Sequence, residues 1–386
     1  MTTPSRRRST ATVLVAHPSA ELYGSDRVML ESVSALVDDG WDVVVAVPTD
    51  GPLLAALRER GARVEICPTP VLRKSVLRPA GMLRFLRTTA SGVRHGSALI
   101  RRERPSLVYV NTITIPLWAA LARVHRTPAL THVHEGEASA SPLMRRILAL
   151  PLFLSSTLVA NSRFSVGVLE QSFRRLARRA EVVYNAVPGP ARHQPVRRDL
   201  NGAVRVTYVG RLSPRKGVDV AIDALVELRS RGVEADLDLV GSVFPGYEWY
   251  EKELRDQVAA ADLGSNVTFH GFVPSVWELV GSGDVVVVPS RVDEPFGNTA
   301  VEAILAGRPV IASATSGLLE ATAGYSTATT VAPGNAGALA DALEDTIEAW
   351  AERADAMWAD TRAAEERHSV ATYRRRIAEI VRRHAR

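Results

Sequence analysis

Short apolar runs, rich in β-branched residues, alternate with helix-length segments over most of the chain. In the first half these runs are almost continuously apolar and cover residues 12–16, 42–47, 63–67, 107–111, 129–133, 156–160 and 181–185. Continuous apolar runs, rather than alternating ones, are typical of strands that are buried on both faces of a parallel sheet. Because helix-length segments separate most of them, the pattern predicts a doubly wound α/β domain.

The pattern stops and then begins again. Residues 186–203 are rich in Pro, Gly and charge and lack apolar periodicity, which is typical of a linker. Further apolar runs follow at 204–210, 236–241, 266–271, 284–290 and 309–313, and the tail from residue 336 reads as charged helix. We therefore expect two doubly wound Rossmann-like domains separated by an interdomain cleft, with domains over 1–190 and 204–365, a linker over 191–203 and a C-terminal helix over 366–386.

Composition narrows the class of protein. Cys67 is the one cysteine, so no intrachain disulfide is possible, and we interpret it as a small buried side chain rather than a nucleophile. The uncharged apolar stretch 147–162 falls short of the ~20 residues that span a bilayer and contains Pro151. No signal peptide is visible. We expect a cytoplasmic protein.

Positive charge is concentrated in the first half. Residues 1–190 contain 25 Lys and Arg against 14 Asp and Glu, a formal charge of +11, whereas residues 191–386 contain 22 against 28, a charge of −6. A basic surface can bind anionic lipid or an anionic acceptor, or it can be no more than solvated helix faces. No nucleic-acid-binding motif accompanies the charge. We expect no nucleic acid partner and a peripheral contact with the inner face of an anionic membrane.

Two strand-to-helix turns in the second half carry candidate chemistry. After the run 204–210 come Arg211, Arg215 and Lys216, and cations beside the free N–H groups of a helix start form a place for phosphate. After the run 284–290, Glu294 lies in a loop and Glu302 lies in the following helix, where carboxylates can accept hydrogen bonds from sugar hydroxyls. Taken alone, the first motif is also typical of a basic surface turn, and the second of a loop acid followed by a solvated helix acid.

Taken together, these strings resemble a known family. GRLSPRKG (210–217), HGFVP (270–274) and PSRVDEPFGNTAVEAILAGRPVIA (289–312) resemble, in sequence and order, the C-terminal domain of the family 4 retaining glycosyltransferases, which adopt the GT-B fold. The spacing of Glu294 and Glu302 matches the E-x7-E motif of that family. The resemblance implies an N-terminal acceptor-binding domain, a C-terminal nucleotide-sugar donor domain, and a C-terminal helix that packs back on the N-terminal domain.

The resemblance also implies roles for residues of the second half. Arg211 and Lys216 are expected to grip the donor diphosphate and stabilise the leaving group. Glu294 is expected to face the donor sugar, and Glu302 to bind the ribose hydroxyls. Further contacts are expected with the nucleobase at Phe272 and Val273, and with the sugar and diphosphate at the helix start formed by Phe296, Gly297, Asn298 and Thr299.

The first half is matched more loosely. The family has a glycine-rich turn, GGxER, after its first strand; here Gly24 matches the second glycine, but Tyr23 stands at the first. Gly24 still permits close backbone approach to a diphosphate. His134 resembles a histidine that the family places near the donor sugar, and we expect it to bind a sugar hydroxyl. Asn111 and Asn161 close two apolar runs and are further candidates for substrate binding.

The expected reaction is a retaining, front-face transfer of a sugar from a UDP- or GDP-sugar to a glycan or lipid-linked acceptor of the cell envelope. It needs neither a metal nor another cofactor, because positioning and leaving-group stabilisation supply the catalysis. A metal site at His132, His134 and Glu135 is disfavoured, since alternation along a strand points Glu135 away from the two histidines. Alternatives are a GT-B sugar-nucleotide epimerase, which would turn over donor without acceptor, and a non-catalytic sugar-nucleotide binding protein.

Overall fold

The chain forms two compact α/β units. The computed structural model describes residues 11–22, 24–72, 79–136, 138 and 140–386. The first unit contains the chain as far as Ala186 together with Val370–Arg386, and the second contains Val187–Ser369. Residues 191–203, the segment expected as a linker, belong to the second unit. Among the described residues no helix is both long enough and apolar enough to cross a bilayer.

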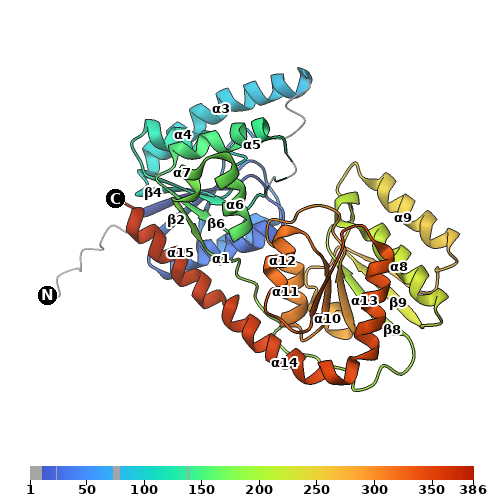
Figure 1. Cartoon of the computed structure of the whole chain (residues 1–386). Coiled ribbons are helices and arrows are strands. Elements are labelled where there is room, and N and C mark those ends of the chain that lie inside the picture. Colours follow the sequence, from blue (N-terminus) through green and yellow to red (C-terminus); the bar gives the residue numbers. More distant parts are fainter. Residues whose placement is uncertain (1–10, 23, 73–78, 137, 139) are drawn as a thin grey trace. The chain divides into compact units, whose positions relative to one another are not determined.

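The first unit is built on a parallel sheet with the strand order β3-β2-β1-β4-β5-β6-β7. The strands are β1 (Thr12–Ala16), β2 (Asp42–Val47), β3 (Arg63–Ile66), β4 (Leu107–Val110), β5 (Ala129–Val133), β6 (Thr157–Ala160) and β7 (Ala180–Val182). Helices on its two faces are α1 (Gly24–Asp38), α2 (Leu53–Glu59), α3 (Pro79–Glu103), α4 (Leu117–Val124), α5 (Pro142–Ala149), α6 (Arg163–Ser172) and α7 (Arg174–Ala177), with a 3₁₀ helix at Leu150–Leu154 (Figure 1). The central strands are fully buried, as their continuous apolar sequences predict.

The C-terminal helix α15 (Val370–His384) packs on α1 and completes the core of this unit. Its apolar side chains enter the same cluster as β1 and β2, and the Tyr373 hydroxyl lies 2.6 Å from the Ser32 hydroxyl. Arg374 donates to the Glu31 carboxylate at 2.6 Å. The end of the chain is therefore an integral part of the first unit.

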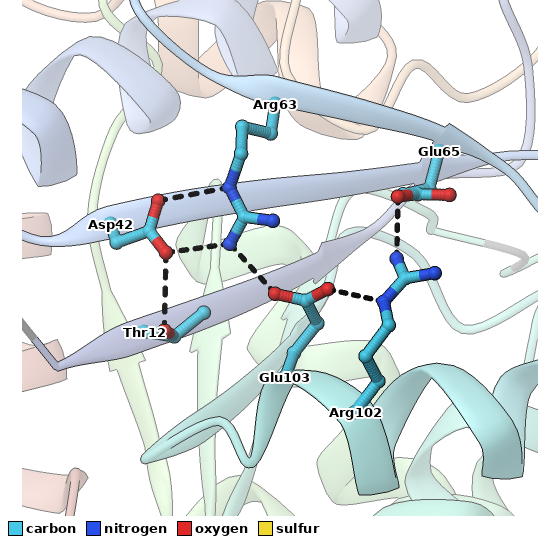
Figure 2. Close-up of polar contacts among 6 residues, drawn as sticks. All are labelled: Thr12, Asp42, Arg63, Glu65, Arg102 and Glu103. Carbon is cyan, nitrogen blue, oxygen red and sulfur yellow. Dashed lines mark hydrogen bonds and ion pairs between the residues drawn. The ribbon is translucent and has the colours of Figure 1, made fainter.

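A network of charged side chains ties α3 to the amino-terminal edge of the same sheet (Figure 2). Arg63 at the start of β3 donates to Asp42 at 2.6 Å and to Glu103 at the end of α3 at 2.7 Å. Arg102 also donates to Glu103, at 2.7 Å. The hydrogen bonds from Arg63 lower the pKa of both Asp42 and Glu103. Exposed pairs of this kind contribute about 0.2–1 kcal/mol each, so the network fixes the position of the α3 end more than it stabilises the fold.

The second unit repeats the design with the parallel order β10-β9-β8-β11-β12-β13. Its strands are β8 (Val204–Val209), β9 (Ala235–Val240), β10 (Val267–Gly271), β11 (Val285–Val288), β12 (Val310–Ser313) and β13 (Ala328–Val331). Its helices are α8 (Val218–Ser230), α9 (Glu248–Ala260), α10 (Trp277–Ser282), α11 (Asn298–Leu305), α12 (Ser316–Thr322), α13 (Ala336–Glu348) and α14 (Trp350–Arg367). The strand order changes direction between β8 and β11, and loops at such a switch point form the usual binding site of a doubly wound sheet.

Candidate functional site

The first candidate site lies in the second unit, in the loop between β8 and α8. Arg211 follows the strand, and its guanidinium carbon lies 3.2 Å from the centre of the Phe244 ring. The Tyr208 hydroxyl donates to the Arg211 carbonyl at 2.9 Å. A 3₁₀ turn, Pro214–Lys216, then leads to Gly217, whose φ of 67° begins α8 in a left-handed conformation. The loop therefore places Lys216 directly before the free N–H groups of a helix start, with Arg211 earlier in the same loop.

The second half of this site is the loop between β11 and α11. Gly297, with a φ of 114°, precedes the helix, which begins at Asn298 as the sequence predicts. The Phe296 side chain is buried against the His368 ring, so only the Phe296 backbone remains for a ligand. Asn298, Thr299 and Glu302 are half-buried and share one face of α11, because residues three and four apart are neighbours on a helix.

The two loops contact one another, and this contact brings the predicted residues Lys216 and Glu294 together. The Lys216 ammonium lies 2.8 Å from a carboxylate oxygen of Glu294, and the Ser290 hydroxyl donates to the same oxygen at 2.8 Å. Arg291 N–H donates to the Arg215 carbonyl at 2.9 Å. The buried Glu294 carboxylate is therefore held by a cation from one loop and a hydroxyl from the other.

The proposed nucleobase turn lies at the same edge of the sheet. Gly241 N–H donates to the Gly271 carbonyl at 2.9 Å, and the backbone of Gly241 approaches Gly210 so closely that a Cβ there would lie 1.9 Å from the Gly210 oxygen. The ends of β8, β9 and β10 are thus packed together. Phe272, which follows β10, exposes 53 % of its surface, and Val273 is half-buried. A flat, exposed aromatic side chain offers a stacking surface for a base.

A second cluster of polar side chains lies in the first unit, at the carboxyl ends of β1, β4 and β5. His17 Nε2 lies 2.7 Å from the Asp26 carboxylate, and His17 Nδ1 lies 3.0 Å from the Asn111 amide nitrogen. The Asn111 amide oxygen lies 3.0 Å from His134 Nε2. Asp26, His17 and Asn111 are each at most 3 % exposed, and His134 is half-buried. The four side chains form one continuous hydrogen-bonded chain that begins at α1 and ends at His134.

The His134 ring packs on that of His132, with centroids 3.9 Å apart. Burial lowers the pKa of His134 to about 3, and burial also lowers the pKa of His132 well below its ordinary value. Both rings are therefore neutral at physiological pH. The two rings lie on one side of β5, whereas the Glu135 carboxylate accepts from the His134 backbone N–H at 3.0 Å and from Thr112.

The remaining predicted residues of the first unit take no part in the chain of hydrogen bonds from Asp26 to His134. The Asn161 amide oxygen accepts from Ser165 at 3.0 Å and from Ser162 at 3.3 Å, at the start of α6. Gly24 is the exposed first residue of α1, and Tyr23 lies outside the described residues. Cys67 is buried, and burial raises the pKa of its thiol to about 11.

Two members of this chain of hydrogen bonds, His17 and Asp26, were not predicted from the sequence. Each had a local signal: His17 directly follows a strand, as Asn111 and His134 do, and Asp26 lies in the first turn of a helix. Carboxyl ends of neighbouring parallel strands meet at one edge, and the order β1-β4-β5 makes these strands neighbours. The strand order is a property of the fold, so the spacing of residues along the sequence could not predict this chain of hydrogen bonds.

Comparison with known proteins identifies the family. The model described as Glycosyltransferase Family 4 matches residues 23–188, and the model described as Glycosyl transferases group 1 matches residues 196–362. Between them they cover most of both units. The chain belongs to the family 4 glycosyltransferases and has the GT-B fold, which confirms the family and the fold class predicted from the sequence.

Individual relatives are more distant. The chain is 28 % identical over 260 residues to glycogen synthase of Mycobacterium tuberculosis, a match that covers 64 % of this chain and 61 % of that one. It is 33 % identical over 132 residues to lipopolysaccharide 1,2-N-acetylglucosaminetransferase of Salmonella typhimurium, covering 32 % and 35 %. It therefore spans less than two thirds of the length of these relatives. The crystal structure of Anabaena HepE in complex with UDP and glucose superposes with a TM-score of 0.79 at 24 % identity, over 96 % of this chain and 99 % of that one.

Proposed function

We propose that this chain is a retaining glycosyltransferase that moves a sugar from a UDP- or GDP-sugar to a hydroxyl of a glycan or lipid-linked acceptor, in the synthesis of cell-envelope polysaccharide or glycolipid. The observation that carries the proposal is the meeting of two loops in the second unit. They bring Arg211, Lys216 and Glu294 to the switch point of a doubly wound sheet, with Glu302 on the helix that follows. The names of the relatives, which include a glycogen synthase and a lipopolysaccharide sugar transferase, support it.

In this proposal the two cations act on the leaving group. The bond between the anomeric carbon and the diphosphate oxygen breaks while the acceptor oxygen attacks from the same side, and the proton of the acceptor hydroxyl passes to the departing oxygen. Arg211 and Lys216, near the helix start, stabilise the negative charge that develops on the diphosphate. Glu294 accepts a hydrogen bond from the donor sugar, and Glu302 accepts from the ribose hydroxyls. The reaction requires no metal, because these side chains supply the positive charge.

A screen of nucleotide sugars by thermal shift, followed by a transfer assay, tests the function. One UDP- or GDP-sugar should raise the melting temperature most, because a ligand that binds only the folded state stabilises it. That donor should then be consumed only when an acceptor is present, with product of unchanged anomeric configuration. Turnover of donor alone would instead indicate an epimerase. Loss of transfer with a chelator, and its recovery with a divalent cation, would overturn metal independence.

We also propose that one surface of the first unit, here called the apolar face, binds an anionic membrane that carries the acceptor. It is made of α3, which packs on α4, and of the 3₁₀ helix Leu150–Leu154, which packs on α4 and on α5, together with α5 itself. Ten large apolar side chains on it are 37–69 % exposed: Met82, Leu83, Leu86, Val93, Leu143, Met144, Ile147, Leu150, Phe153 and Leu154. Apolar side chains interleaved with exposed arginines, among them Arg84, Arg87, Arg94 and Arg146, are typical of a surface that lies in a membrane interface.

Vesicle sedimentation tests this contact. The protein should bind vesicles that contain anionic lipid and should bind neutral vesicles much less, since each arginine near an anionic surface contributes about 1 kcal/mol. The double variant Leu83→Glu, Leu86→Glu should lose this binding. Val226→Glu, which alters an exposed apolar residue of α8 in the second unit, is the matched control and should retain it. Equal binding to both kinds of vesicle would contradict the proposal.

A further inference from the structure

The chain of hydrogen bonds from Asp26 to His134 has a direction, and the chemistry at its first residue sets that direction. An ionised carboxylate can only accept hydrogen bonds. Asp26 Oδ1 accepts from His17 Nε2 at 2.7 Å and from the Ser19 hydroxyl at 3.0 Å. His17 Nε2 therefore carries a proton. The Asn111 amide nitrogen faces His17 Nδ1, and because an amide N–H can only donate, Nδ1 presents a lone pair.

Each later link follows from the one before it. The lone pair on His17 Nδ1 requires a donor, and the Asn111 amide nitrogen supplies it at 3.0 Å. An amide whose nitrogen faces His17 directs its oxygen the other way, towards His134 Nε2 at 3.0 Å. A carbonyl oxygen is an acceptor, so His134 Nε2 must carry the proton. The reverse orientation of the amide would bring two acceptors together at His17 Nδ1 and two donors together at His134 Nε2.

We propose that Asp26, acting through His17 and Asn111, holds His134 in the tautomer protonated at Nε2, so that the His134 Nδ1 lone pair accepts a hydrogen bond from a sugar hydroxyl of the substrate. Asp26, His17 and Asn111 are positioning residues in this scheme, and His134 is the group that contacts the sugar. The inference rests on the proposed glycosyl transfer for the identity of the ligand, but the tautomer itself does not depend on it.

Packing around His134 favours a fixed, uncharged ring. The His132 ring lies against it at 3.9 Å, and His132 is itself held through Nδ1 by the Tyr109 hydroxyl at 2.7 Å. The charged or titratable groups that face His134 are His17, Asp26 and His132, and burial keeps the pKa of His134 at about 3. No described residue forms a hydrogen bond with His134 Nδ1, which leaves that nitrogen for a ligand.

The substitution Asp26→Asn should remove the fixed direction of the chain, because an amide can accept through its oxygen or donate through its nitrogen. When the new amide donates to His17 Nε2, the His17 proton lies on Nδ1 and is donated to the Asn111 oxygen, and the rotated Asn111 amide donates to His134 Nε2. The His134 proton then lies on Nδ1, three side chains away from the substitution, so both His134 tautomers should be populated. A purely structural role for Asp26 would predict no such transfer.

Nitrogen-15 NMR of the imidazole rings in the substrate-free protein reads the tautomer directly. In the wild type, His134 should show a protonated Nε2 and an unprotonated Nδ1, and Asp26→Asn should show a mixture of the two tautomers. Ser19→Ala is the matched control, because it removes the other hydrogen bond to the same carboxylate without changing the direction of the chain, and it should leave the tautomer as it is. A wild-type His134 protonated at Nδ1 would overturn the proposal even if Asp26→Asn failed to fold.

Kinetics with deoxyfluoro sugars test the contact with substrate. Fluorine replaces the hydroxyl at one position and cannot donate, so the wild type should lose about tenfold in kcat/KM at the contacted position, the size of one hydrogen bond. In Asp26→Asn the native substrate should lose part of this factor, and the further penalty for fluorine at that position should shrink. An unchanged fluorine penalty would contradict the sugar contact. Absence of any transfer by the wild type would instead count against the proposed function, while the NMR result would still decide the tautomer.

Discussion

Gly217 joins the two loops of the donor site, and its replacement by alanine is the most direct structural perturbation of that junction. The residue begins α8 with a φ of 67°, a conformation that costs an L-residue about 1–2 kcal/mol. A Cβ at this position would lie 2.0 Å from the Pro289 carbonyl oxygen. Because ordinary contacts begin at 3.4 Å, the end of β11 would have to retreat by about 1.4 Å. The loop that carries Ser290 and Glu294 would move with it.

Gly232, beyond the other end of α8, provides a matched control. Its φ is 86°, and a Cβ there would have nothing within 4 Å. Gly232→Ala should therefore lower the free energy of unfolding by the conformational cost alone, about 1–2 kcal/mol. Gly217→Ala should add an overpacking cost of about 1–3 kcal/mol, for a total of about 2–5 kcal/mol.

Urea unfolding of both variants measures these free energies, and calorimetric titration with the donor measures the consequence for binding. Gly217→Ala should weaken donor binding at least about tenfold, since it displaces both the Lys216 turn and the Glu294 loop, and an error of 1 Å in positioning has effects of this size. Gly232→Ala should bind donor as the wild type does. Equal losses of stability in the two variants, or full donor affinity in Gly217→Ala, would refute the reasoning.

Three further predictions concern stability and reactivity. Phe296→Ala, which empties a fully buried position beside His368, should lower the free energy of unfolding by about 3–5 kcal/mol in urea titrations, and a loss below about 1 kcal/mol would contradict the packing. His132 stays neutral in the folded protein, but in the unfolded chain it binds a proton below about pH 6.5, so acid destabilises the native state by about 1.4 kcal/mol per pH unit through this residue. His132→Gln should remove that dependence. The urea midpoint of the variant should therefore fall less than that of the wild type between pH 7 and 5. Iodoacetamide at pH 8 should leave Cys67 unmodified in the native protein and alkylate it in urea, because burial raises the pKa of the thiol to about 11, and rapid native labelling would contradict this.

The sequence predicted the sheets well where strands are central and apolar. The runs at 12–16, 42–47 and 129–133 coincide with β1, β2 and β5, because strands buried on both faces are largely apolar. The edge strand β13 was missed, since its sequence, ATTV, is only partly buried and carries two threonines. Predicted runs extended past the ends of several strands, as at β11, where Asp284 instead accepts from Arg197 at 2.8 Å.

The candidate site was predictable to the extent that it is local. The start of α11 and the cations of the β8–α8 loop lie within short motifs, where turn geometry and helix starts follow from neighbouring residues. The pairing of Lys216 with Glu294 joins residues 78 positions apart, and it depends on β8 and β11 being neighbours in the sheet. The same holds for His17 and Asn111, which the order of β1 and β4 brings together.

Calorimetric titration of nucleotide sugars into the wild type, Arg211→Ala, Lys216→Ala and Arg215→Ala tests the central claim most directly. Arg215 is an exposed cation of the same turn, so it controls for the loss of one charge. We predict that the wild type binds a UDP- or GDP-sugar, that Arg211→Ala and Lys216→Ala each weaken this binding at least about tenfold, the size of a charge-assisted hydrogen bond, and that Arg215→Ala weakens it about threefold or less. Equal affinities in all four proteins, or no binding of any nucleotide sugar by the wild type, would contradict the account.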